Sequence, residues 1–181
     1  MKKWLILCIG VWALSFQALA DEYQTVIQEF KKSNQTTSFF NNAYGYAVFP
    51  NIGKGGIGIG GSYGEGKVYM RGNPTGKVKM GQVTIGFQLG GQVFSQIIFL
   101  QDKRAFDEFT SGSFEFAAQA SAVALTLGTS AQAGTSGTGA AAGSQQAPAH
   151  YVSGYAVFTL AKGGLMYEAS IGGQKFSYTP N

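Results

Sequence analysis

The chain has 181 residues, a formal net charge of +4, 27 glycines, one histidine and one cysteine. Its small excess of basic residues is not clustered, which argues against nucleic acid as a partner. A single cysteine and a single histidine exclude a disulfide framework and the usual zinc or copper sites, so we expect no metal.

The first twenty residues have the pattern of a secretion signal. Two lysines precede an apolar run from Trp4 to Phe16, and Ala18-Leu19-Ala20 supplies small residues for cleavage. The apolar run is too short for a bilayer-spanning helix, which needs about 20 residues. We therefore expect residues 1–20 to be a cleaved signal peptide and residues 21–181 to form one domain in the periplasm, either free or held at the surface of the outer or inner membrane.

An amphipathic helix is predicted at the start of the mature chain, from Asp21 to Lys32. Its apolar residues recur at i, i+3, i+4 and i+7, and its charges complement the helix dipole, with acidic residues early and Lys31 and Lys32 late. Two interpretations remain open. The apolar stripe packs on a sheet, or it enters a membrane interface with Lys31 and Lys32 near the headgroups.

A glycine-rich stretch from Gly45 to Tyr69 reads GYAVFPNIGKGGIGIGGSYGEGKVY and predicts successive strands joined by tight turns. Glycine at alternate positions removes side chains from one face, which permits close approach of a neighbour. GYAVF recurs at residues 154–158, and KGG occurs at both Lys54 and Lys162. Lys67 and Lys175 each follow thirteen residues later. We infer two related β-units that display lysines beside glycine turns.

Between the two copies we expect more strands and one further helix. Residues 78–89 and 93–100 alternate in polarity and predict a long hairpin or a bent strand pair. Asp102 is suited to begin a helix that Gly112 ends. Alternation from residue 114 favours a strand, although alanine-rich composition leaves residues 117–127 open as strand or helix. Residues 128–149 are of low complexity and predict a flexible loop. The expected fold is α+β, with a coiled antiparallel sheet, either open or closed on itself.

Residues suited to catalysis do not form a recognisable set in this sequence. His150 borders the low-complexity loop, and the Gly58-x-Gly60 motif lacks the strand–turn–helix context of a dinucleotide site. Ser62 and Ser170 have no nucleophile elbow around them. We therefore expect no enzyme activity and no cofactor.

Four segments together resemble the SYLF-domain family over residues 23–178. They read GYAVFPNIGKGGIGIGGSYGEGKVY, VTIGFQLGGQVFSQIIFL, DKRAFDEFTSG and KGGLMYEASIGG. That family includes phosphoinositide-binding and actin-associated proteins in eukaryotes and secreted or envelope proteins in bacteria. The resemblance implies lipid binding by an N-terminal amphipathic helix and by basic residues. Lys54, Lys67 and Lys162 are the basic residues that fall in matching motifs.

The function that we expect is non-catalytic binding of an anionic lipid or membrane surface, with the helix and glycine-flanked lysines as contacts. The candidate residues are Lys31, Lys32, Lys54, Lys67, Lys162 and Lys175. Two other classes remain open: a small outer-membrane β-barrel, and an envelope scaffold that binds proteins through its strand edges. The identity of the lipid and the membrane leaflet also remain open.

Overall fold

The computed structural model describes residues 22–57, 59–85, 91–116, 124–127, 149–163 and 173–181. The expected signal peptide, the segment 117–123 and nearly all of the loop 128–149 lie outside the described residues. The described part combines helices with one large, mostly antiparallel sheet, so the α+β class is confirmed.

The elements follow one another in a simple order along the chain. Residues 22–31 form a leading helix. It is followed by α2 (Asn34–Asn42), β1 (Gly45–Ile57), β2 (Ile59–Met70), β3 (Asn73–Ile85), β4 (Gln92–Leu100), α3 (Lys103–Phe109), β5 (Ser113–Glu115), β6 (Ala124–Leu127), β7 (Tyr155–Gly163) and β8 (Lys175–Pro180). The prediction that Asp102 begins α3 is confirmed, since its carboxylate accepts a hydrogen bond from the backbone N–H of Ala105 at 2.8 Å.

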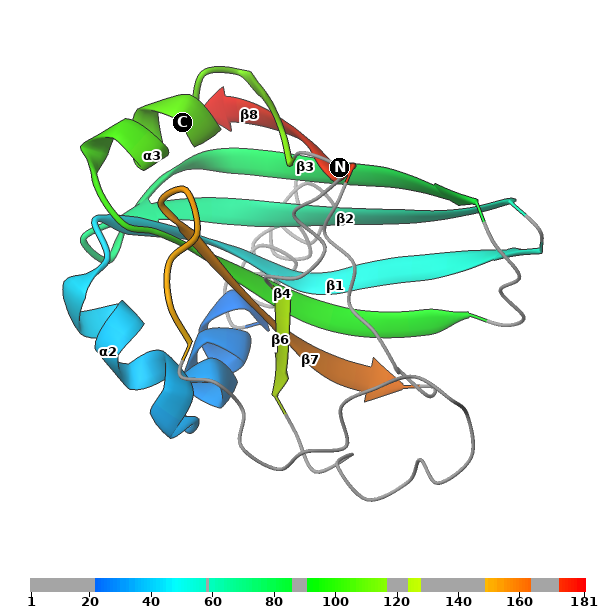
Figure 1. The fold of residues 1–181 in the computed structure, drawn as a ribbon, viewed down its shortest axis with the longest axis horizontal. Helices are drawn as coiled ribbons and strands as arrows, with labels where there is room; N and C mark the ends of the chain where they lie inside the picture. The colour runs from blue at the N-terminus through cyan, green and yellow to red at the C-terminus, as the bar shows by residue number, and fades with distance from the viewer. Residues whose placement is uncertain (1–21, 58, 86–90, 117–123, 128–148, 164–172) are drawn as a thin grey trace, which may run out of the picture.

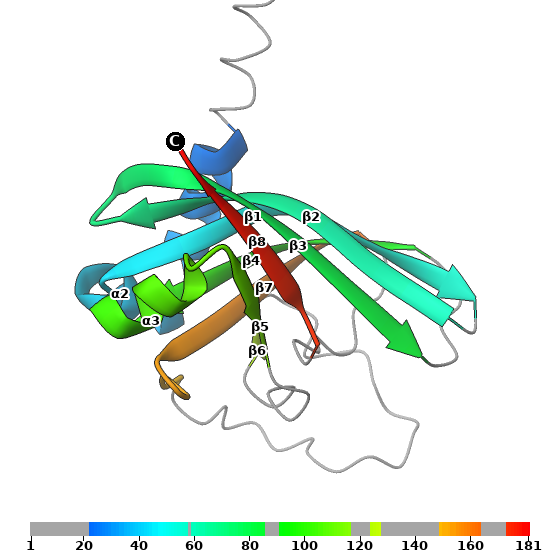
Figure 2. The same ribbon diagram turned by 90° about the horizontal axis from the view of Figure 1, so that it is seen from above.

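The strands form an open sheet with the order β5-β8-β3-β2-β1-β4-β7-β6. Neighbouring strands are antiparallel except β6 and β7, which are parallel. Within the described residues no ladder joins the end strands β5 and β6, so the sheet does not close on itself. Figure 2 shows its strong twist, with β8 running at a clear angle to β2 and β3.

The expected hairpin between residues 78–89 and 93–100 is wrong. β3 pairs with β2 and β8, whereas β4 pairs with β1 and β7. The β1–β2 hairpin therefore lies between the two strands that we expected to pair. Burial explains the placement, because β4 is buried at nearly every position and suits the middle of a sheet that is covered on both faces.

Each face of the sheet carries its own hydrophobic core. On one face, which we call the α2 face, the leading helix and α2 bury Phe30 and Phe39 against Phe99 and Phe158. On the other, the α3 face, α3 and β8 place Phe109 and Phe176 near Phe49 of β1. Figure 1 shows the helices at the end of the sheet where β1 begins, while the other ends of β1 to β4 run on beyond them.

The two GYAVF copies lie on either side of β4, but they are offset by one residue. Phe99 is paired with Tyr46 on one side and with Ala156 on the other, although the counterpart of Tyr46 in the repeat is Tyr155. A shift of one residue moves each side chain to the opposite face of a sheet. Tyr46 accordingly packs on the α2 face and Tyr155 on the α3 face.

Candidate functional site

Lys67 lies beside the leading helix on the α2 face. Its Nζ atom is 4.5 Å from the centre of the Tyr23 ring, within the range of a cation–π contact. In the sheet, Lys67 is paired with Val48 of β1 on one side and with Lys77 of β3 on the other. The structure thus brings one of the expected lysines together with the expected helix.

Lys54 projects from the opposite face, so the structure does not bring Lys54 and Lys67 together on one surface. Lys54 is paired with Ser62, which lies five residues before Lys67 in the regular part of β2. Side chains alternate between faces along a strand, and an odd separation therefore places Ser62 and Lys67 on different faces. Lys54 shares the α3 face with Ser62.

The other expected lysines all have contacts on or near the α2 face. Lys162 donates a hydrogen bond to Asn51 Oδ1 at 3.0 Å. Lys175 lies 3.6 Å from a carboxylate oxygen of Glu115. At the end of the leading helix, the Nζ atom of Lys31 lies 5.4 Å from the Phe40 ring centre. The Nζ atom of Lys32, the next residue, lies 2.6 Å from a carboxylate oxygen of Glu29.

Four lysines on three neighbouring strands form what we call the lysine band: Lys67, Lys77, Lys79 and Lys175. The strand register places all four on the α2 face, since Lys67 is paired with Lys77 and since Gly81, two residues after Lys79, is paired with Lys175. Lys77, Lys79 and Lys175 are exposed. Lys77 and Lys79 were not among the expected site residues, although their alternation around Val78, which is buried, places them on one face of a strand.

Carboxylates offset part of this charge. Glu65 lies 3.8 Å from Lys79, and Glu115 lies 3.6 Å from Lys175, so four positive charges are accompanied by two negative ones. Lys67 and Lys77 face each other directly, and like charges in that position destabilise a sheet. A bound anion would relieve this repulsion, so the band is suited to a negatively charged surface or group.

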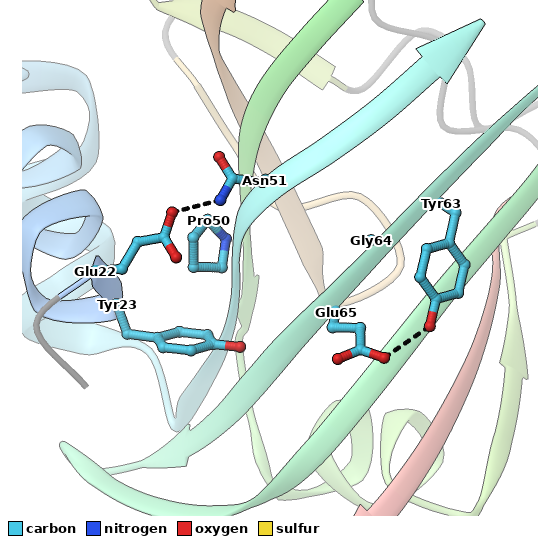
Figure 3. Close-up of a pocket in the computed structure, with 7 residues that line it drawn as sticks. All are labelled: Glu22, Tyr23, Pro50, Asn51, Tyr63, Gly64 and Glu65. Atoms are coloured by element: carbon cyan, nitrogen blue, oxygen red, sulfur yellow. Dashed lines mark hydrogen bonds between the residues drawn. The ribbon is translucent and has the colours of Figure 1, made fainter. Parts of the chain in front are cut away.

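A polar pocket of about 260 Å³ opens between the leading helix and the β1–β2 pair, and Figure 3 shows its residues. The Asn51 side-chain amide donates to Glu22, and the Tyr63 hydroxyl donates to Glu65 at 2.8 Å. Burial, and then the charges of Glu65 and Glu22, raise the pKa of Tyr23. With two carboxylates in its lining, this pocket does not suit an anion.

A second pocket, of about 280 Å³, has a cationic lining that includes Lys31 and Arg71. Arg71 and Gly72 form the two-residue turn between β2 and β3, and both have positive φ, at 51° and 84°. A left-handed conformation costs a residue with a side chain roughly 1–2 kcal/mol, and glycine would avoid that cost. Arg71 was not among the expected site residues, and in the sequence only its position before Gly72 indicates this turn.

In the part of the chain that the structure describes, no group of three or more histidine, cysteine, aspartate or glutamate residues could hold a metal ion. None of the described helices has both the length and the apolarity needed to cross a membrane.

Comparison with known proteins shows the family of this chain. Residues 81–179, more than half of the chain, match the model of a family described as "Ysc84: Las17-binding protein actin regulator". The chain belongs to the Ysc84 family. This is the SYLF-domain family that the four sequence segments resemble, so the expected family is confirmed. The matched range contains Lys175 of the lysine band, while Lys67, Lys77 and Lys79 precede it.

The chain is also similar to beta cell expansion factor A of Aeromonas veronii. The two are 28% identical over 166 residues, which cover 90% of this chain and 56% of the relative. This Ysc84-family chain therefore spans about half the length of that relative.

Proposed function

We propose that this Ysc84-family chain is a non-catalytic protein that binds anionic lipid surfaces through the lysine band. The observation that carries the proposal is the placement of four lysines on adjacent strands of one sheet face, three of them exposed and two directly opposed. The expected secretion signal supports a location in the periplasm, and an anionic envelope lipid is the partner that we propose there.

The lysine band alone gives weak binding. Each lysine near an anionic membrane surface contributes about 1 kcal/mol, and this attraction falls off within a Debye length of about 10 Å at 0.1 M salt. Glu65 and Glu115 offset part of it. Binding is therefore sensitive to salt, and a stable complex needs a second, apolar contribution.

The leading helix does not supply that apolar contribution while it stays docked. Val26, Ile27 and Phe30 are at most 3% exposed, because they pack in the core of the α2 face. Within the proposal the helix contributes the charges of Lys31 and Lys32 and holds Tyr23 against Lys67. Lys31, with Arg71, offers a second anion contact in the cationic pocket.

The family description names Las17 binding and actin regulation. We assign neither to this chain, because the expected secretion signal separates it from cytoplasmic partners. A protein partner of the envelope is the competing proposal. It predicts binding that is insensitive to vesicle composition.

Co-sedimentation with vesicles tests the proposal. The Lys77→Gln/Lys79→Gln variant should bind phosphatidylglycerol-containing vesicles roughly 30-fold more weakly, because two contributions of about 1 kcal/mol are lost. Lys103→Gln is the matched control, since Lys103 lies on α3 and pairs with Asp107 at 2.6 Å. Equal binding by the band variant and the control, or equal binding to neutral vesicles, would contradict the proposal.

A further inference from the structure

Exposed apolar side chains gather on the α2 face beyond the helices. Ile59 is 70% exposed, Val83 76%, Tyr63 54% and Val93 42%. The first three lie on β2 and β3, where Gly61 is paired with Val83, and Val93 lies on β4. We call these four residues the apolar patch.

The strand register places all four residues of the patch on the same face. Ile59, Gly61 and Tyr63 alternate along β2, so they share a face with Val83, the partner of Gly61. Gly53 of β1 is paired with both Tyr63 and Val93, which brings Val93 to that face as well. Figure 1 shows these ends of β1 to β4 projecting away from the helices.

Glycines occupy the strand positions between these side chains. A Cβ atom added at Gly53, Gly55 or Gly81 would meet no atom within 4 Å, so the face is open there. The four apolar side chains therefore project from a face on which the positions between them carry no side chains, so their flanks are exposed. This arrangement suits contact with a continuous apolar environment.

The patch adjoins the lysine band without a break. Tyr63 is paired with Gly81, and Gly81 is paired in turn with Lys175. Glu65, which accepts the Tyr63 hydroxyl hydrogen bond, lies beside Lys79. The surface therefore passes from apolar side chains through a tyrosine to lysines, which is the order of groups found across a membrane interface.

We propose that the apolar patch inserts into the headgroup and upper acyl region of an anionic bilayer while the lysine band contacts the headgroups. The proposal rests on the proposed lipid binding and identifies the apolar contribution that the band alone lacks. Charge favours a bilayer over a second copy of this chain, because a second copy would bring another band of the same sign to the interface.

The test uses the purified protein with the same N-terminus in every variant, checked by mass spectrometry. Ile59→Thr/Val83→Thr removes apolar groups while keeping β-branched shapes that strands accommodate. We expect at least a tenfold loss of affinity for phosphatidylcholine vesicles that contain phosphatidylglycerol. Val152→Thr is the matched control, because Val152 is an exposed apolar residue outside the patch, and it should bind like the unaltered protein.

An environment-sensitive fluorophore gives a second readout. In a Cys8→Ser background, a label on Val83→Cys should brighten on vesicle binding and be quenched by shallow lipid-attached quenchers. The same label on Ser111→Cys, an exposed turn residue after α3, should not respond.

The outcomes separate the two proposals. If Lys77→Gln/Lys79→Gln weakens binding but the threonine pair does not, and the label at position 83 stays unchanged, the insertion is overturned and the lysine band stands. If the unaltered protein does not bind anionic vesicles, both proposals fail. If the threonine pair instead dissociates a dimer in sedimentation without vesicles, the patch is an interface between copies and not a membrane contact.

Discussion

Replacement of Gly66 by alanine tests how the glycine-rich strands pack. Gly66 lies on the α3 face of β2, and a Cβ atom there would come within 2.7 Å of both the Val48 carbonyl oxygen and the Phe49 ring. The carbonyl belongs to the backbone of the neighbouring strand and cannot move aside alone. Overpacking of this kind costs about 1–3 kcal/mol of unfolding free energy, which lowers the melting temperature by roughly 2–12 °C in a domain of this size.

Gly81→Ala is the matched control, because a Cβ atom at Gly81 would meet nothing within 4 Å. Alanine restricts the unfolded chain more than glycine, so this variant should be as stable as the unaltered protein or about 0.4–1 kcal/mol more stable. Thermal unfolding followed by circular dichroism measures both. If Gly66→Ala melts at the same temperature as Gly81→Ala, β1 and β2 do not pack as described.

Two further predictions concern polar contacts. Hydrogen bonds from Arg104, and then from Tyr155, lower the pKa of Glu108 in the folded protein. These bonds therefore stabilise the folded state fully above the unfolded-state pKa of 4.5. The stabilisation is lost as the pH falls through the lower pKa of the folded state. The difference in melting temperature between Glu108→Gln and the unaltered protein should therefore shrink as the pH falls from neutral to about 3, and a constant difference would argue against this pairing. Gln96 and Gln174 are buried and exchange amide hydrogen bonds at 3.0 and 3.2 Å, so Gln96→Leu should cost about 1–3 kcal/mol by leaving its partner unpaired. Denaturant unfolding should show that adding Gln174→Leu recovers part of this loss, and strictly additive losses would be inconsistent with the pair.

Local features of the fold could be predicted from the sequence because they depend on neighbouring residues. Alternating glycines between Gly45 and Tyr69 predicted the strands that became β1 and β2, and Asp102 predicted the start of α3. The pairing of the strands could not be predicted in this way. A period of two marks a strand but does not identify its neighbours. β4 pairs with β1 and not with β3 as expected, because both of its faces are buried and a strand of this kind belongs in the middle of the sheet.

Register also decided how much of the candidate site could be predicted. Lys54 and Lys162 hold the same position in the two KGG copies, yet Lys54 shares a face with Ser62 and Lys162 bonds to Asn51 near the leading helix. The two lysines reach different faces because β1 carries a β-bulge between Val48 and Asn51, which shifts the register ahead of Lys54 and which the sequence repeat does not reveal. The lysine band was missed for a related reason, because Lys77 and Lys79 become neighbours of Lys67 only after β2 and β3 have paired.

Phe30 distinguishes the two roles that the sequence left open for the leading helix. Its side chain is fully buried in the core of the α2 face. Truncation of a buried phenylalanine to alanine costs about 3–5 kcal/mol, so Phe30→Ala should lower the melting temperature by roughly 6–20 °C in the absence of lipid. If the apolar stripe of the helix were instead free to enter a membrane, Phe30→Ala would leave the melting temperature almost unchanged.

Lys32→Ala, just after the same helix, is the control. Lys32 is exposed and pairs with Glu29, and exposed ion pairs contribute about 1 kcal/mol or less. This variant should melt within a few degrees of the unaltered protein. An unchanged melting temperature for Phe30→Ala, together with weaker vesicle binding, would show that the helix leaves the sheet to bind lipid. The apolar contribution would then come from the helix, and the apolar patch at the ends of β1 to β4 would no longer be needed to explain binding.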